Sequence, residues 1–511
     1  MIISLSVLVI TIIVSGTYAL YKAQLSKNIG VNTTTHGLAY YINYVKGTDI
    51  TAATLNPSTS YEGGASSDIE FWKKDDSYDI YGKIELTVNT IGTNLSNSPA
   101  LKYAVVNNGN VLKEGSLKGT TSGSKVTILK NLYLEQTKQI YTVYVWLDNS
   151  EELGNISNES LSISVDCTAS LQKEPTAADT IISLYTSAAK VTATNNSITY
   201  NTAPSVSLMN DRLGGTTTSL DGGNIRYYGA SPNNYIYFNC SDYSNQTSST
   251  CETWRIIGVF DGKLKLIRGS QIGTYSWDNK DTSTGAESNF GKNDWTTARL
   301  MKLLNPSDYY TTDSNDNNLG QGLYYNSASG KCYSGQNNAT VDCNFTSTGI
   351  KNDITRNMIA ETTYNLGGWN SNTVYPNLMY EKERGTTVYT GRPTTPWTGK
   401  IALAYTSDYG YAADLNQCKD KTLYDYNNST CTSNNWMKAI ITNNGSNSGW
   451  LLTPYCSTSS NVWYVYPVGN VYFNYTVYSA FGAVPVLSLS SELGIESGGD
   501  GSSSNPYKLS A

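Results

Sequence analysis

The fold is constrained most strongly by a series of short segments of alternating polarity between residues 38 and 170. Alternation of apolar and polar side chains is typical of β-strands that bury one face. The strands are predicted at residues 84–91, 101–106, 125–129, 140–147 and 161–165. Asn108 and Gly109 stand between two of them and indicate a type I′ hairpin turn. Short strands at regular spacing predict an all-β sandwich domain over residues 25–172.

A hydrophobic segment opens the chain. Residues 1–20 carry no charge and are rich in Ile, Val and Leu, and as a helix they are long enough to cross the hydrocarbon layer of a membrane. We predict a hydrophobic helix within residues 1–24. It is either a signal peptide cleaved after Ala19 or an uncleaved anchor through residues 2–20, and a buried core helix is the third possibility. Both exported interpretations place the rest of the chain outside the cell, at the cell surface or anchored to the membrane.

Six of the eight cysteines form three successive couples, each bracketing a short segment rich in Asn, Ser and Thr. The couples are Cys240 with Cys251, Cys332 with Cys343, and Cys418 with Cys431. Such local loops close readily as disulfides in an oxidising compartment. A metal site fits less well, because no Cys-X-X-Cys motif occurs. Cys167 and Cys456 are expected to remain thiols.

Composition excludes several function classes. A net charge of −6 with only 15% charged residues argues against a nucleic-acid partner, which would require a basic excess. The single histidine, His36, lies near the N-terminus, so no Ser-His-Asp or Cys-His arrangement and no ordinary His-ligated metal site is available farther along. We therefore predict no catalytic residues, no metal and no cofactor. Residues 313–318 resemble an acidic calcium loop but lack the Gly and Glu of an EF-hand, so a solvated turn is favoured and calcium stays an open alternative.

Residues 173–223 are predicted to be a helical stalk followed by a linker. Thr176 and Asp179 form a variant capping box before an apolar helical stripe, and residues 192–223 are rich in Thr, Ser and Gly. From residue 224 onward, aromatic residues are embedded in Asn, Ser, Thr and Gly. Helices are predicted at 294–305 and 352–366, and strands at 254–259, 263–267, 400–405 and 484–489. Residues 224–511 are therefore predicted to form an α+β domain.

Residues 439–491 contain no charged side chain, and Tyr, Asn, Ser and Thr alternate there with valines. We expect Val462, Val465, Val468, Val471 and Val477 to pack inward while the aromatic and polar residues point outward. Tyr and Trp give large contact area with few rotamers to immobilise, and Ser and Asn adapt their hydrogen bonds, so recognition surfaces favour this composition. The alternative is an ordinary tyrosine-rich hairpin that turns at residues 467–470.

Several segments beyond residue 224 together resemble a bacterial surface-protein domain related to the formylglycine-generating-enzyme branch of the C-type lectin fold. The segments are 254–259 (Trp-Arg-Ile-Ile-Gly-Val), 294–295 (Asp-Trp), 449–454 (Gly-Trp-Leu-Leu-Thr-Pro), 484–489 (Val-Pro-Val-Leu-Ser-Leu), 498–501 (Gly-Gly-Asp-Gly) and 505–507 (Asn-Pro-Tyr). One position departs from the family: Ala483, Val484 and Pro485 stand where the family usually has Val-Arg-Pro. The enzyme activity of that branch would require a reactive cysteine pair, and no second cysteine is predicted near Cys456.

The resemblance implies that the segment before the last strand is a ligand-binding face. In some relatives diversity-generating retroelements rewrite this segment by mutating adenines, which turns Asn codons into Tyr, Ser, Thr and a few others. The predicted ligand-binding residues are Tyr455, Ser457, Thr458, Asn461, Trp463, Tyr464, Tyr466, Asn470, Tyr472, Asn474, Tyr475 and Tyr478. All of them except Trp463 are either Asn or residues that adenine mutation of an Asn codon can produce. We therefore expect an adhesin-like surface protein that binds a protein or glycan through residues 455–483. The alternative is an envelope or fibre subunit that self-assembles through the same face.

Overall fold

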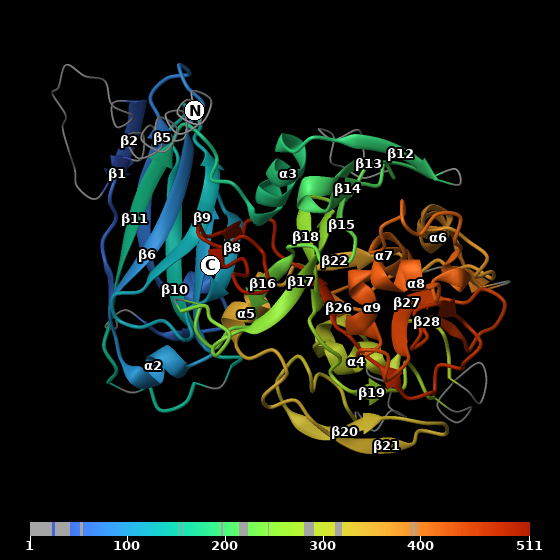
Figure 1. Cartoon of the computed structure of the whole chain (residues 1–511). Helices are drawn as coiled ribbons and strands as arrows, with labels where there is room; N and C mark the ends of the chain where they lie inside the picture. Colours follow the sequence, from blue (N-terminus) through green and yellow to red (C-terminus); the bar gives the residue numbers. More distant parts are fainter. Residues whose placement is uncertain are drawn as a thin grey trace. The chain divides into compact units, whose positions relative to one another are not determined.

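The computed structural model divides the chain into two compact units, with the boundary between Glu174 and Pro175 (Figure 1). It describes residues 23–25, 41–51, 55–151, 153–156, 158–195, 198–213, 223–243, 245–280, 291–311, 319–389, 392–393 and 396–510. The hydrophobic segment 1–20, and with it the predicted N-terminal helix, lies outside these residues. Within the described ranges, no helix combines the length and the apolar character that crossing a membrane requires.

The first unit consists of two β-sheets. One has the order β1-β11-β6-β9 with β3 also paired to β11, and the other has the order β2-β5-β10-β7-β8 with β4 also paired to β10. The strands are β1 (Ala23–Leu25), β2 (Ile42–Val45), β3 (Ile50–Thr51), β4 (Pro57–Ser58), β5 (Ala65–Lys73), β6 (Tyr81–Ile91), β7 (Leu101–Asn107), β8 (Asn110–Ser116), β9 (Lys125–Tyr133), β10 (Ile140–Asp148) and β11 (Leu161–Ser170). A short helix, α2 (Thr93–Asn97), follows β6.

Alternating side chains of the two sheets meet in one core. Ile69 and Phe71 of β5 and Ile84 and Leu86 of β6 are all 0% exposed and belong to the same hydrophobic cluster. Two sheets that bury facing side chains in this way form a β-sandwich, in agreement with the sequence prediction. The hairpin turn at Asn108 and Gly109 is also confirmed, because both residues have the positive φ of a type I′ turn.

The second unit contains a nine-stranded sheet and a five-stranded sheet. The first has the order β12-β13-β14-β15-β17-β18-β31-β26 with β16 paired to β17, and the second has the order β19-β30-β27-β28-β29. The strands of the larger sheet are β12 (Val191–Asn195), β13 (Ile198–Ala203), β14 (Leu208–Asn210), β15 (Ile225–Tyr227), β16 (Tyr235–Phe238), β17 (Glu252–Phe260), β18 (Lys263–Arg268), β26 (Ile401–Ala402) and β31 (Val486–Ser488). Those of the smaller sheet are β19 (Thr274–Tyr275), β27 (Gly449–Pro454), β28 (Val462–Val465), β29 (Val471–Tyr472) and β30 (Phe481–Gly482).

Short helices and two-stranded ribbons complete this unit. The helices are α3 (Ala177–Ser187), α4 (Arg299–Leu304), α5 (Asp353–Met358), α6 (Pro376–Glu383), α7 (Thr406–Tyr411), α8 (Ser429–Ser433) and α9 (Trp436–Ile441). The ribbons pair β20 (Ser329–Tyr333) with β21 (Thr340–Asn344), β22 (Thr362–Tyr364) with β25 (Trp397–Gly399), β23 (Thr387–Tyr389) with β24 (Arg392–Pro393), and β32 (Gly494–Ile495) with β33 (Leu509–Ser510). The protein is thus a β-rich mixed fold.

The segment predicted to be a stalk and linker is instead part of the second unit. The capping box of Thr176 and Asp179 does begin α3, as predicted. However, Ile181 and Tyr185 of this helix are buried in the main core of the unit, and β12 to β14 extend its large sheet. The apolar stripe of the helix therefore has a covering surface in the same unit, which a free stalk would lack.

Both predicted helices of the C-terminal region are shorter than expected. The first begins only at Arg299, because the preceding residues form turns and the amide of Leu300 donates to the carbonyl of Trp277. The second ends at Met358, where Ile359 forms a bridge to Leu489 and the amide of Ala360 donates to Ser488. In each case, backbone groups that would continue the helix bond to another part of the chain.

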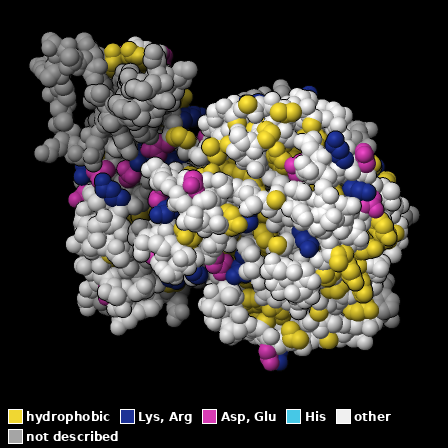
Figure 2. Space-filling model, in the orientation of Figure 1, with side chains coloured by type: hydrophobic (Ala, Val, Ile, Leu, Met, Phe, Trp, Pro, Cys, Tyr) yellow, Lys and Arg dark blue, Asp and Glu magenta, His cyan; other side chains and the backbone are white. Residues whose placement is uncertain are grey.

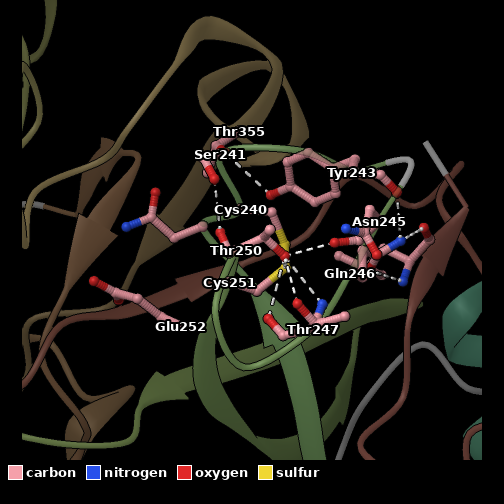
Figure 3. Close-up of a disulfide and its surroundings, with 12 residues drawn as sticks. Cys240, Ser241, Tyr243, Asn245, Gln246, Thr247, Thr250, Cys251, Glu252 and Thr355 are labelled. Carbon is pink, nitrogen blue, oxygen red and sulfur yellow. Dashed lines mark hydrogen bonds between the residues drawn. A yellow bond between two sulfur atoms is a disulfide. The ribbon is translucent and has the colours of Figure 1, made fainter.

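The three predicted disulfides are all present: Cys240–Cys251, Cys332–Cys343 and Cys418–Cys431. The first closes the loop between β16 and β17, which the hydroxyl of Thr250 also stabilises by accepting from the amide of Thr247 (Figure 3). Within this loop, the side chain of Gln246 donates to the carbonyl of Leu509 at 2.7 Å and accepts from its amide at 2.9 Å. The loop thereby holds β33. Three disulfides indicate an oxidising, extracellular environment.

Removing the first disulfide is expected to loosen the C-terminal strand. The double variant Cys240→Ser/Cys251→Ser should lose about 2–3 kcal/mol of unfolding free energy, because its unfolded chain is no longer constrained. Amide hydrogen exchange should also accelerate in residues 494–510. Cys332→Ser/Cys343→Ser is a matched control, since both disulfides have a sequence separation of 11. The control should lose a similar unfolding free energy and leave amide exchange at the C-terminus unchanged. Equal acceleration of exchange in both variants would contradict the conclusion that the loop closed by Cys240–Cys251 holds β33.

Candidate ligand-binding face

The charge-free segment forms a hairpin at one edge of the five-stranded sheet. β28 and β29 pair antiparallel, with Tyr464 opposite Tyr472. The chain turns through residues 467–469, and the amide of Gly469 donates to the carbonyl of Tyr466 at 2.8 Å. Gly469 has a φ of +107°, a conformation that glycine adopts without strain. The hairpin turn at residues 467–470, which belonged to the alternative interpretation of this segment, is therefore present.

Neighbouring side chains on β28 point to opposite faces of the sheet, and both faces are covered. Trp463 is 0% exposed and packs with Phe473, the ring centroids being 5.1 Å apart. Tyr464 is 1% exposed and packs from the other face on Trp450 and Phe481, at centroid distances of 6.1 and 5.0 Å. The hairpin is thus fixed to the domain by two aromatic side chains.

The structure corrects the predicted outward orientation of Trp463, Tyr464 and Asn470, which are only 0%, 1% and 2% exposed. The error arises because alternation along a strand separates its two faces but does not show whether one of them meets solvent. β28 has a neighbouring strand on each side and packing on both faces. The opposite error concerns Val468, which was expected to pack inward and is 51% exposed at the tip of the hairpin.

Four tyrosines form a partly exposed aromatic surface, which we call the tyrosine face: Tyr424, Tyr466, Tyr472 and Tyr475. Tyr424, Tyr466 and Tyr475 are 44%, 41% and 47% exposed. Tyr472 lies between Tyr424 and Tyr466, with centroid distances of 5.4 and 5.8 Å. Tyr475 contacts the buried Tyr464 at 5.6 Å. Hydrophobic side chains gather on the surface of this unit in the region of β27 and β28, where few charged side chains are visible (Figure 2).

The other predicted residues lie around the hairpin with different roles. Ser457 and Asn474 are exposed, whereas Tyr455, Thr458, Asn461 and Tyr478 are partly buried. The ring of Tyr455 is stacked on Phe473 at 4.1 Å. The amide of Asn461 donates to the hydroxyl of Thr458, and its side chain donates to the carbonyl of Phe473. Most of these groups therefore shape the loop rather than present themselves to a ligand.

A residue that the sequence reasoning missed holds this loop in place. Asn293 is 1% exposed, and its side-chain amide donates to the carbonyls of Tyr455, Thr458 and Asn461 at 2.8–3.1 Å. Three backbone carbonyls of one loop are thus bound by one buried side chain. The only signal in the sequence is that Asn293 precedes the Asp-Trp segment of the resemblance.

Tyr424 is the second residue that the sequence reasoning missed. It comes from a 3₁₀ turn, η7 (Leu423–Asp425), and reaches the hairpin only through the fold. A hydrogen bond to Tyr472 raises the pKa of Tyr424, so the hydroxyl of Tyr424 remains protonated at neutral pH. The tyrosine face presents phenol hydroxyls, which donate and accept hydrogen bonds, beside apolar ring area.

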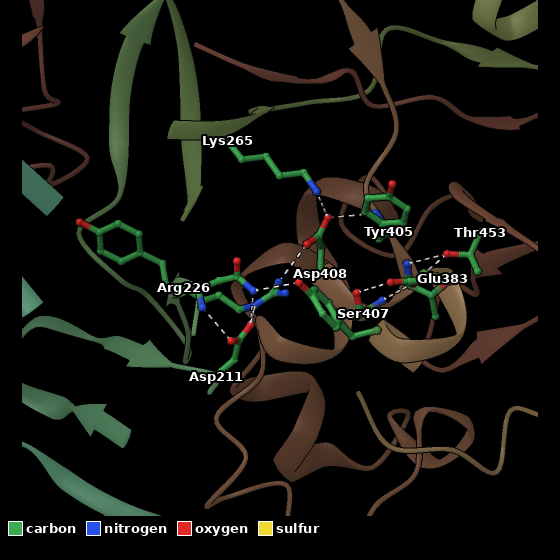
Figure 4. Close-up of polar contacts among 12 residues, drawn as sticks. Asp211, Arg226, Lys265, Glu383, Tyr405, Ser407, Asp408 and Thr453 are labelled. Atoms are coloured by element: carbon green, nitrogen blue, oxygen red, sulfur yellow. Dashed lines mark hydrogen bonds and ion pairs between the residues drawn. The ribbon is translucent and has the colours of Figure 1, made fainter. Parts of the chain in front are cut away.

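A buried network of charged residues connects α7 to the large sheet of the second unit (Figure 4). Asp408, on α7, contacts the Nζ atom of Lys265 and accepts from the Nη1 atom of Arg226 at 2.9 Å. Arg226 also pairs with Asp211. Burial opposes ionisation of Asp408, but Lys265 and Arg226 outweigh it and hold the pKa of Asp408 below its usual value. These contacts tie α7 to the large sheet through ion pairs that water does not reach.

Glu383 connects the same region to the strand that leads into the face. Its carboxylate accepts from the hydroxyl and the amide of Ser407 and from the hydroxyl of Thr453, the last at 2.9 Å. Thr453 belongs to β27, just before the loop that begins at Tyr455. Burial raises the pKa of Glu383, since only Arg384 lies close enough to compensate its charge in part. The base of the face is therefore rigidly connected to α6 and α7.

Cys167 and Cys456 are outside the three disulfides. Cys456 is partly buried beside Gly368 and Lys382, and burial raises the pKa of its thiol to about 11. At neutral pH the reactive thiolate is therefore scarce. Among the described residues, no three His, Cys, Asp or Glu side chains are grouped so that they could hold a metal ion. The loop considered for calcium, residues 313–318, lies outside the described residues.

Comparison of the chain with models of known protein families finds no match, and comparison with curated proteins finds none either.

Proposed function

We propose that this chain is an exported, non-catalytic binding protein of the bacterial cell surface, with a C-type-lectin-like second unit that recognises a protein or glycan through the tyrosine face. The observation that carries the proposal is the exposure of Tyr424, Tyr466 and Tyr475 at 41–47%, on and beside a hairpin whose segment, residues 439–491, has no charged side chain. Large exposed rings are unfavourable in water unless a partner covers them. The disulfides are in keeping with the proposed location.

The lectin-like assignment is supported by where the motif residues lie. Trp254, Trp295 and Trp450 come from three distant segments of the resemblance, and each is at most 1% exposed. All three belong to one hydrophobic cluster, together with Leu487 of segment 484–489 and Tyr507 of segment 505–507. Motif segments that are far apart in the sequence thus contribute to a single core, as expected if they specify a shared fold.

The test is binding by a variant that lacks the exposed rings. Tyr424→Ala/Tyr466→Ala/Tyr475→Ala should weaken binding about 10–100-fold, because exposed aromatic anchors contribute most of the energy of such contacts. Its stability should change by no more than about 0.5 kcal/mol per site. The probe is the fluorescently labelled protein on an array of purified glycans and extracellular proteins, with dissociation constants measured for each spot that binds.

Tyr78→Ala is the control, because Tyr78 is 46% exposed in the first unit and should not affect binding. An equal loss of binding in Tyr78→Ala would contradict the assignment of ligand binding to the tyrosine face. If nothing on the array binds and the wild-type chain associates with itself in a concentration-dependent manner that the triple variant lacks, the protein is an assembly subunit instead. Turnover lost in Cys456→Ala would overturn the non-catalytic assignment.

A further inference from the structure

Arg255 is a buried cation without an acidic partner. It lies on β17, is 7% exposed, and donates from Nε to the side chain of Asn234 and from Nη2 to the carbonyl of Pro232. Its guanidinium lies over the rings of Tyr235 and Trp436, at 3.7 and 4.9 Å from their centroids. None of the described carboxylates pairs with it, in contrast to Arg226, which pairs with two of them.

The positive charge of a buried guanidinium requires a compensating negative charge nearby. Charged side chains are seldom buried unless an opposite charge accompanies them. The two ring faces and the two oxygen acceptors compensate Arg255 in part, but none of them carries a full negative charge. Burial accordingly lowers the pKa of Arg255 to about 10, opposed only by the hydroxyl of Tyr235. Arg268, buried on the neighbouring strand, shows the usual solution, because Glu252 binds it with both carboxylate oxygens.

The geometry leaves one nitrogen of Arg255 available. Among the described residues Nη1 has no hydrogen-bond or ion-pair partner, and it is not fully buried. The loop 230–233 lies beside the guanidinium, since Pro232 accepts from it. Ser231 and Asn233 in this loop are exposed, and their amides donate to no described acceptor. A guanidinium nitrogen and the unbonded amides of the residues on either side of Pro232, whose carbonyl the guanidinium binds, together provide donors of the kind that an oxyanion accepts from.

We propose that Arg255 and the loop 230–233 form a binding site for a small oxyanion group, a phosphate, sulfate or carboxylate, on the surface of the second unit. Tyr235 and Trp436 fix the orientation of the guanidinium, so little rotamer freedom is lost when the anion binds. The anion supplies the charge that the protein omits. This site lies on β16 and β17 and does not depend on the tyrosine face of β28 and β29.

The test compares thermal unfolding with phosphate, sulfate or acetate against chloride at equal ionic strength. At about 10 mM of the preferred anion, the melting temperature of the second unit, measured in the full wild-type chain, should rise by about 2 °C or more. Arg255→Met should lose this response. Lys382→Met should keep it, because that lysine lies over the ring of Trp369, away from the proposed site, and serves as a matched cation–π control.

Equal responses in wild type and Arg255→Met would overturn the proposal, since general salt effects would then explain the shift. A wild-type response no larger in the oxyanions than in chloride would overturn it as well. If Arg255→Met does not fold, Arg255→Lys keeps the charge but loses the planar nitrogen pair, and it should show a weakened response. Crystals soaked in selenate give a direct readout: an anomalous peak within hydrogen-bonding distance of Arg255 supports the site, and its absence at saturating selenate contradicts it. Failure of the tyrosine variants on the array would leave all these outcomes unaffected.

Discussion

Asp408→Asn is expected to lower the unfolding free energy of the second unit by about 3–5 kcal/mol, the range found when one partner of a buried ion pair is removed. The neutral side chain would leave Lys265 and Arg226 buried with only Asp211 to balance them. Because the folded pKa of Asp408 is lowered, its contribution is present at neutral pH and is lost as the pH falls through that value. The measurement is urea unfolding followed by circular dichroism at pH 7 and at acidic pH.

Glu383→Gln provides the matched control within the same network. Burial raises the pKa of Glu383, so the folded state favours the protonated form and becomes less stable as the pH rises through the folded pKa. Glutamine is neutral and retains an oxygen for Ser407 and Thr453. The variant should therefore lose little unfolding free energy at low pH, and its stability relative to wild type should increase as the pH rises. If the two substitutions destabilise equally at every pH, the charges of this network do not have the assigned roles.

Trp463→Ala is expected to destabilise the second unit by about 3–5 kcal/mol, as for other buried aromatic residues. The side chain is 0% exposed among residues that include Phe473 and Val465, and its removal leaves a cavity between them. Tyr475→Ala, a few residues along the same hairpin, should change stability by no more than about 0.5 kcal/mol because that ring is 47% exposed. Urea midpoints from circular dichroism decide the comparison, since fluorescence would change with the tryptophan itself.

If Trp463→Ala and Tyr475→Ala lower the unfolding free energy equally, the hairpin is not divided into buried and exposed aromatic residues. The pair also bears on the proposed function. Loss of binding in Trp463→Ala would reflect loss of the folded hairpin, whereas loss in the exposed tyrosine variants at unchanged stability would report on the ligand contact itself. A variant of the buried ring is therefore a structural control and not a test of recognition.

The features that the sequence predicted correctly are those set by short chain distances. The three disulfides join cysteines separated by 11 or 13 positions, and the turn at Asn108 and Gly109 depends on two adjacent residues. The capping box of α3 spans only Thr176 to Asp179. Local closure and local hydrogen bonds need no knowledge of the rest of the molecule, so their residue pattern is sufficient.

The sequence by itself determined the β-rich character of both units, the disulfides and the charge-free, tyrosine-rich composition of residues 439–491. Only the tertiary structure decided that Trp463 and Tyr464 are core, that Tyr424 joins Tyr472 on the surface, and that α3 packs on the second unit rather than standing free. The physical reason is that periodicity along a strand or helix is fixed by its own backbone geometry. Burial, by contrast, depends on which distant residues cover each face, as Asn293 and Phe473 do here.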